Sequence, residues 1–174
     1  MISRLSYRTR QFSNSLPVPR KPVPDEALVP YLPPAQLSLF RKMQPSEQAH
    51  AFAICKSLEI SNQTDPELLT AALLHDVGKI LHPMSLFGRV AVVLGNRFFR
   101  ETARRWAAGT PRGLRLPFVV AAQHAAWGAE LAAQAGATAR TVELIRRHHD
   151  TLLPNPGAHT ELLLAALQSA DDQN

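Results

Sequence analysis

Apolar residues recur along most of the chain at the three- and four-residue spacing of amphipathic helices. This pattern predicts helices over residues 35–43, 47–58, 66–76, 86–108, 118–134, 139–149 and 161–170. β-branched residues cluster only at 90–93, which is too short a run to predict a sheet. We therefore predict an all-α protein, a helical bundle.

Local signals mark where several of these helices begin and end. Asp65 is expected to cap the helix over 66–76, with Pro66 at its first position. Gly78 is expected to stop that helix in a left-handed conformation. Ser46 and Thr138 are the predicted caps of two further helices.

The first thirty residues differ from the rest of the chain. Seven prolines between positions 17 and 34 preclude a continuous helix there, and five basic residues precede the first acid, Asp25. We predict an irregular, proline-rich basic arm over residues 1–30 and one folded domain over residues 31–174. Within that domain, residues 86–116 are expected to form a cap or docking section.

The net charge of +5 belongs to the arm, because 14 basic residues balance 14 acidic ones from residue 25 onward. Specific nucleic-acid binding is therefore not predicted. Cys55 is the only cysteine, which excludes an intramolecular disulfide and suits a reducing compartment. With no transmembrane run and no secretory signal expected, we predict a cytoplasmic location; the Arg- and Ser-rich start also resembles an organellar transit peptide.

Five histidines and two aspartates fall where a helical bundle can bring them together, since each continues an apolar stripe or ends a buried helix. Asp171 continues such a stripe, whereas Asp172 does not. Hydrogen-bonded core histidines are the alternative, but five imidazoles and a buried carboxylate are hard to satisfy without a metal. Imidazole and carboxylate ligands without thiolates suit Zn, Fe, Mn or Co. The predicted metal ligands are His50, His75, Asp76, His124, His148, His149 and Asp171.

The segment AALLHDVGK, residues 71–79, resembles the defining segment of HD-domain metal-dependent phosphohydrolases. The resemblance extends from about Ser46 to Asp171. The ligand order is also similar to that of the two-metal HD-GYP type, although the GYP signature is absent after His148-His149. The resemblance implies one ion on His50, His75, Asp76 and Asp171, and a second on Asp76, His124, His148 and His149.

The same resemblance implies a phosphohydrolase that cleaves a phosphoester of a nucleotide or other small phosphorylated molecule with metal-activated water. Asp76 and Lys79 are the expected catalytic residues, with Lys79 neutralising a phosphate oxygen. An ordinary solvated lysine is the alternative for Lys79. For the whole chain, the alternative is a non-catalytic metal-binding scaffold or regulatory protein. His82 and His159 are expected to play no part.

The section between residues 86 and 115 is both basic and apolar. From Arg89 to Arg115 there are seven arginines and a single acid, Glu101. Residues 86–99 include eight large apolar side chains: Leu86, Phe87, Val90, Val92, Val93, Leu94, Phe98 and Phe99. Three interpretations stay open: contact with a polyanionic substrate, peripheral contact with an anionic membrane or a partner, and a cap helix with solvated arginines. The oligomeric state is not predicted.

Overall fold

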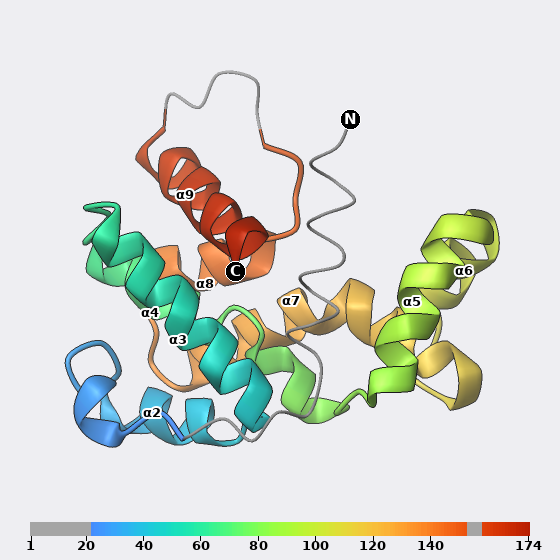
Figure 1. The fold of residues 1–174 in the computed structure, drawn as a ribbon, viewed down its shortest axis with the longest axis horizontal. Helices are drawn as coiled ribbons and strands as arrows, with labels where there is room; N and C mark the ends of the chain where they lie inside the picture. Colours follow the sequence, from blue (N-terminus) through green and yellow to red (C-terminus); the bar gives the residue numbers. More distant parts are fainter. Residues whose placement is uncertain (1–21, 153–157) are drawn as a thin grey trace.

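The computed structural model describes residues 22–152 and 158–174, and every regular element in these two ranges is helical (Figure 1). The all-α prediction is therefore confirmed. In chain order the elements are the 3₁₀ helix η1 (Asp25–Ala27), α2 (Pro34–Arg41), α3 (Pro45–Ile60), α4 (Pro66–Leu74), the 3₁₀ helix η2 (Val77–Leu81), α5 (Leu86–Phe98), α6 (Arg100–Ala107), the 3₁₀ helix η3 (Gly113–Arg115), α7 (Leu116–Gln134), α8 (Ala139–Arg147) and α9 (His159–Gln173).

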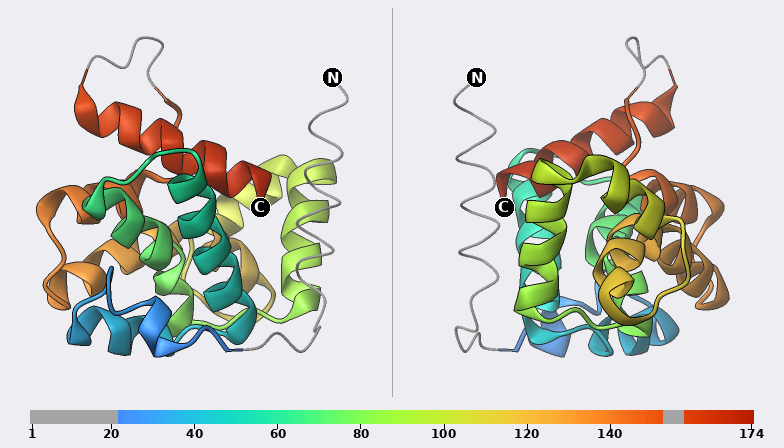
Figure 2. Two further views of the ribbon diagram at one scale, coloured as in Figure 1. Left: turned by 60° about the vertical axis from the view of Figure 1, so that its left-hand side comes forward. Right: turned by 90° about the vertical axis from the view of Figure 1, so that its right-hand side faces the viewer.

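Helix α4 forms the centre of the bundle and packs against α3, α8 and α9. Its residues from Ala71 to Leu74 are all buried, as are Leu68 and Leu69. Figure 2 shows α9 lying across α3 and α4. Fully burying a leucine side chain contributes about 1.5–3 kcal/mol, so this apolar helix holds its neighbours together.

The start of α4 agrees with the prediction, but its end does not. Asp65 accepts hydrogen bonds from the backbone N–H groups of Glu67 and Leu68, and Pro66 occupies the first turn. The helix ends at Leu74, and η2 follows after a two-residue turn. Gly78 is not among the described residues with positive φ, so the predicted left-handed stop is wrong.

Gly78 is instead needed for a close backbone contact between η2 and α7. A Cβ atom at this position would lie 1.9 Å from the carbonyl oxygen of His124 and 2.7 Å from the backbone nitrogen of Gly128. Gly128 faces Gly78 in the same contact. Two glycines thus let two backbones meet.

Two further boundaries differ from the sequence-based expectation. Gln44 rather than Ser46 caps α3, because Pro45 takes the first helical position and Glu47 Oε2 accepts from the Gln44 N–H at 3.3 Å. The single helix expected over 86–108 is broken at Phe99, whose φ of −134° and ψ of 48° are not helical. Thr138 caps α8 as predicted.

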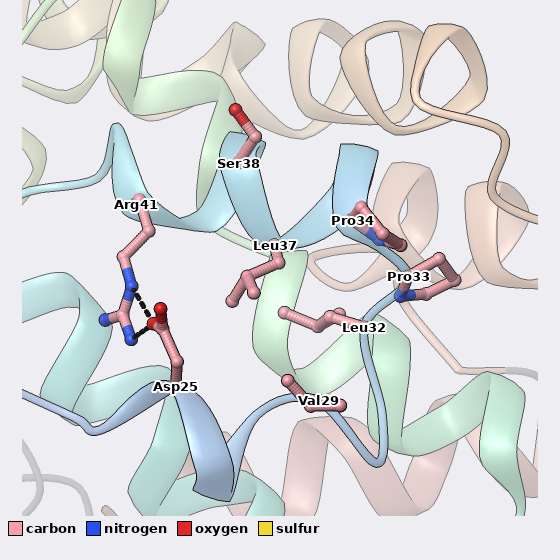
Figure 3. A pocket seen from close by; sticks show the side chains of 8 residues that line it. All are labelled: Asp25, Val29, Leu32, Pro33, Pro34, Leu37, Ser38 and Arg41. Atoms are coloured by element: carbon pink, nitrogen blue, oxygen red, sulfur yellow. Dashed lines mark hydrogen bonds and ion pairs between the residues drawn. The ribbon is translucent and has the colours of Figure 1, made fainter.

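The described residues before position 31 pack against the body. Val23 and Leu28 are buried in the same core as α4, and Arg41 pairs with Asp25. A surface hollow of about 450 Å³ lies beside this ion pair, between η1 and α2 (Figure 3). It contains no histidine. Residues 1–21, the greater part of the predicted arm, lie outside the described residues.

Helices α5 and α6 form a hairpin at one edge of the bundle (Figures 1 and 2). It contacts the body mainly through α7: Gly95 lies against the ring of Phe118, and the rings of Trp106 and Phe118 are 5.3 Å apart.

In the described part of the chain, no single helix is long and apolar enough to cross a membrane. One bent pair, Pro66–Leu81 with Leu86–Phe98 at 99°, meets the requirements of length and composition together.

Replacing Gly78 with alanine should destabilise the protein by about 3 kcal/mol or more, because the added methyl group meets backbone that cannot move aside. Gly136→Ala is the matched control. Its Cβ meets nothing within 4 Å, so only its positive φ of 79° should cost stability, about 1 kcal/mol. Urea denaturation measures both losses. Equal losses in the two variants would contradict the close contact.

Candidate metal centre

Five segments that are distant in sequence bring the predicted ligands together. His50 lies on α3, His75 and Asp76 in the turn after α4, and His124 on α7. The remaining ligands are His148 and His149, directly after α8, and Asp171, near the end of α9. The ligand atoms form two groups, and within each group they lie within 4.8 Å of one another.

The first group consists of His50, His75 and Asp171. His50 Nε2 lies 3.0 Å from Asp171 Oδ1, and the rings of His50 and His75 are 5.7 Å apart. Burial raises the pKa of the Asp171 carboxyl, but the His50 hydrogen bond and the charge of His75 outweigh burial and lower it to about 2. Asp171 is therefore a carboxylate at neutral pH.

The second group consists of His124, His148 and His149. The His124 ring lies 5.3 Å from that of His148 and 5.1 Å from that of His149. His124 Nε2 and His149 Nε2 are 3.3 Å apart. His148 Nε2 is buried and has no hydrogen-bond partner among the described residues. A buried, unpartnered ring nitrogen is costly, and a metal ion would satisfy it.

Asp76 lies between the two groups and directs one oxygen toward each. Its Oδ1 is 3.2 Å from His124 Nε2, and its Oδ2 is 3.6 Å from His75 Nε2. Burial raises the pKa of this carboxyl, but Lys79, His75 and His124 together hold it well below its ordinary value. Asp76 is thus a buried carboxylate that faces both groups of ligands.

Three of the five histidines have their ring orientation fixed by their own helix. The Nδ1–H groups of His75, His124 and His148 donate to backbone carbonyls three or four residues earlier, at 2.9, 2.8 and 2.7 Å. A carbonyl only accepts, so Nδ1 carries a proton and, in the neutral imidazole, Nε2 keeps its lone pair. A backbone carbonyl that accepts from the other ring nitrogen is typical of metal-ligating histidines, so the donor set fits a metal ion.

Two imidazoles of the second group, His148 and His149, favour their neutral form. Burial, followed by the charges of His75 and His149, holds the pKa of His148 well below its ordinary value. Desolvation and the neighbouring His124 lower the pKa of His149 to about 4. Neutral imidazole is the form that binds a metal.

Lys79 and a second ion pair lie beside the centre. Lys79 Nζ is 2.5 Å from Asp76 Oδ2. Glu47 is buried and pairs with Arg89, with 3.0 Å between Glu47 Oε1 and Arg89 Nη2. Burial raises the pKa of Glu47, and Lys79, Asp76 and Arg89 all act on it electrostatically. Two cations therefore border the site on the side of Glu47.

Sequence reasoning missed Glu47 and Arg89 as neighbours of the centre. A signal for Glu47 was present, because it precedes His50 by three residues and so shares its face of α3. The position of Arg89 depends on how α5 docks, which no local pattern indicates. The His82 ring lies 5.4 Å from the Trp127 ring at a tilt of 60°, and His159 lies beside Asp65; neither histidine is a member of the two ligand groups.

A helical bundle that gathers histidines and aspartates from five segments around a buried carboxylate defines a helical His/Asp metal-binding domain. Comparison with protein-family models matches residues 48–172 to the HD domain. The chain therefore belongs to the HD domain family, whose members are generally metal-dependent hydrolases. The match includes every predicted ligand. No curated protein and no solved structure gives a significant match to the chain.

The metal-free protein should lose stability as the pH falls from about 6.5 toward 4. His149 has a pKa of about 4 in the fold, so through this window the unfolded chain binds the proton and the folded chain does not. The free energy of unfolding consequently decreases with falling pH. His148 acts in the same direction.

Urea denaturation in the presence of a chelator, between pH 4 and 8, measures this slope. His149→Gln should flatten it, because glutamine does not titrate. His159→Gln is the control, since His159 is exposed and lies outside both groups. A slope that is identical in wild type and His149→Gln would contradict the assigned cause.

Proposed function

We propose that this HD-domain protein is a phosphohydrolase. It cleaves a phosphoester of a small phosphorylated molecule, with a nucleotide as the expected class, and it depends on one or two divalent metal ions. The observation that carries this proposal is the position of Asp76, whose two oxygens face His75 and His124 in separate groups. Asp76 Oδ2 is 3.6 Å from His75 Nε2 and Oδ1 is 3.2 Å from His124 Nε2, so each oxygen is placed to share an ion with one group.

The ligands proposed for each ion are the members of one group together with Asp76. The first ion would be held by His50, His75, Asp76 and Asp171, and the second by Asp76, His124, His148 and His149. Zn, Fe, Mn and Co all suit these ligands. When bound, such ions lower the pKa of a coordinated water from about 15.7 to about 7 and offset the charge of phosphoryl oxygens.

The protein's own residues would prepare the site for an anionic substrate. Lys79 is one-fifth exposed and carries its charge beside Asp76, where it can bind a phosphate oxygen. Arg89 supplies a second positive charge near Glu47. The Nδ1–H hydrogen bonds of His75, His124 and His148 hold the rings in place, so little reorganisation accompanies binding.

Exposure of the centre favours an enzyme over a purely structural metal site. Structural sites are closed by protein ligands, whereas catalytic sites keep an open position. Here His149 packs against His124 on one side but leaves part of its surface in solvent, whereas His124 and His148 are buried, so the second group borders solvent. A non-catalytic scaffold would need neither this opening nor the cation at Lys79.

Asp76→Asn should lower hydrolysis by at least about 100-fold and reduce the bound metal, because the amide keeps the shape but loses the bridging charge. Metal analysis of the purified protein measures the second effect. Assays with p-nitrophenyl phosphate, its bis-ester and a nucleotide panel, each with Mn, Fe, Co and Zn, measure the first and separate monoesterase from diesterase activity. Asp172→Asn is the matched control, because this exposed neighbour of Asp171 belongs to neither group.

Wild-type turnover by Asp76→Asn would refute the metal-dependent mechanism. A wild-type protein that holds both ions at full occupancy yet hydrolyses nothing in the panel would favour the scaffold alternative.

Lys79→Met should lower kcat/KM by about 10- to 100-fold without reducing the bound metal, because it removes a charge that acts on the substrate. Lys79→Arg should restore part of the loss. Lys42→Met is the control, since Lys42 is exposed and remote from the ligand groups. An unchanged kcat/KM in Lys79→Met would assign Lys79 to the ordinary solvated lysines.

A further inference from the structure

The outer side of α5 carries a stripe of exposed apolar residues. Phe87, Leu94 and Phe98 are 85, 50 and 68% exposed, and the exposed Ala91 lies between them. Their spacings of four, three and four residues place all four on one helix face. We call these four residues the outer stripe. Phe99, 69% exposed, follows at the break before α6, so two adjacent phenylalanines occupy the tip of the hairpin.

Neither the core nor the metal centre accounts for the outer stripe. Gly88 and Gly95 mark the side of α5 that packs on α7, where they meet Pro117 and Phe118. Arg89, which contacts Glu47 beside the centre, is about 200° around the helix from Phe87. The outer stripe therefore lies on the opposite side of α5 from the metal centre.

The charged residues around the hairpin tip are arginines, with one acid among them. Arg97 and Arg100 flank the two phenylalanines, and α6 adds the exposed Arg104 and Arg105. Within the described ranges, none of these four arginines forms an ion pair. Glu101 is the only acid between residues 86 and 115. The surface of the hairpin thus has exposed apolar side chains and an excess of positive charge.

This charge distribution decides between the occupants that an apolar helix face could have. Pairing of this face with a second copy of the chain would bring together two hairpins that both carry an excess of positive charge. A nucleic acid would satisfy the arginines and would stack bases on the phenylalanines, but the aliphatic Ala91 and Leu94 between Phe87 and Phe98 offer it no stacking partner. An anionic lipid surface satisfies both features, because acyl chains take the apolar residues and head-group phosphates take the arginines.

We propose that the α5–α6 hairpin docks on the surface of an anionic lipid bilayer. Phe99 and the outer stripe enter the boundary between head groups and acyl chains, and Arg97 and Arg100 bind lipid phosphates. Docking in this orientation turns the outer stripe toward the lipid and leaves the Arg89 side of α5, beside the metal centre, facing away. Bound protein therefore remains open to a water-soluble substrate.

Co-sedimentation of the full chain with vesicles tests this proposal. Binding is expected to vesicles that contain roughly 30% phosphatidylserine, to weaken at about 0.5 M salt, and to be absent with phosphatidylcholine alone. The pair Phe98→Ser and Phe99→Ser should weaken binding by more than about tenfold. The pair Arg97→Gln and Arg100→Gln should weaken it by about 25-fold, since each arginine near the surface contributes about fivefold.

Matched controls address surface apolarity and charge elsewhere in the chain. Ile60→Ser removes an equally exposed apolar side chain at the end of α3, and Lys42→Gln with Arg146→Gln removes two exposed charges. Arg8→Gln with Arg10→Gln tests the basic residues of the N-terminal segment. A tryptophan in place of Phe98 should be quenched by brominated lipid, whereas a tryptophan in place of Ile60 should not.

Circular dichroism checks that each variant is folded, which is expected for the variants at residues 42, 60, 97–100 and 146 because those side chains are exposed. The proposal is overturned if anionic vesicles do not bind the wild type. It is also overturned if the controls weaken binding as much as the hairpin variants do. If the wild type forms a dimer that Phe98→Ser with Phe99→Ser dissociates, and it does not bind vesicles, the occupant is a second copy of the chain. An oligonucleotide bound in place of vesicles would identify a nucleic acid.

Discussion

The backbone of η2 touches the backbone of α7 at Gly78 and Gly128, and no side chain fits between them. This contact sets the distance between the turn that carries Asp76 and the helix that carries His124. A wider separation would leave the Asp76 carboxylate buried beside only one group of histidines. The free-energy cost of burying its charge would then be less fully offset by nearby polar groups. The arrangement of the ligands in two groups therefore depends on Gly78, which has no side chain and lies two residues after Asp76.

Much of the fold follows from local chemistry that the sequence displays. Asp65, Pro66 and Thr138 act as their positions predict, because capping needs only neighbouring backbone. The errors arise where tertiary contacts decide. Gly78 looked like a helix stop but serves a backbone contact with a residue 50 positions away, which no local pattern encodes. The break at Phe99 likewise lets α6 fold back onto α7.

The candidate ligands could be chosen from the sequence because each continues a buried stripe or follows a buried helix. Their grouping could not be derived from those stripes, since it depends on how α7 packs on η2 and how α8 packs on α4. The family resemblance supplied that grouping, and the observed sets of His50 with Asp171 and of His124 with His148 agree with it. The ion pair between Glu47 and Arg89 was not predicted, because it spans 42 residues between α3 and α5.

His50 and Asp171 are 121 residues apart in sequence, yet their side chains meet at 3.0 Å. An ion held by both would close a loop that contains most of the domain. Loop closure removes conformational freedom from the unfolded chain, and a covalent bridge across a loop of this size contributes on the order of 5 kcal/mol. A chain with Cys55 as its only cysteine forms no disulfide of its own. The metal centre would thus also serve as the protein's long-range cross-link, joining the first helix of the family match to the last.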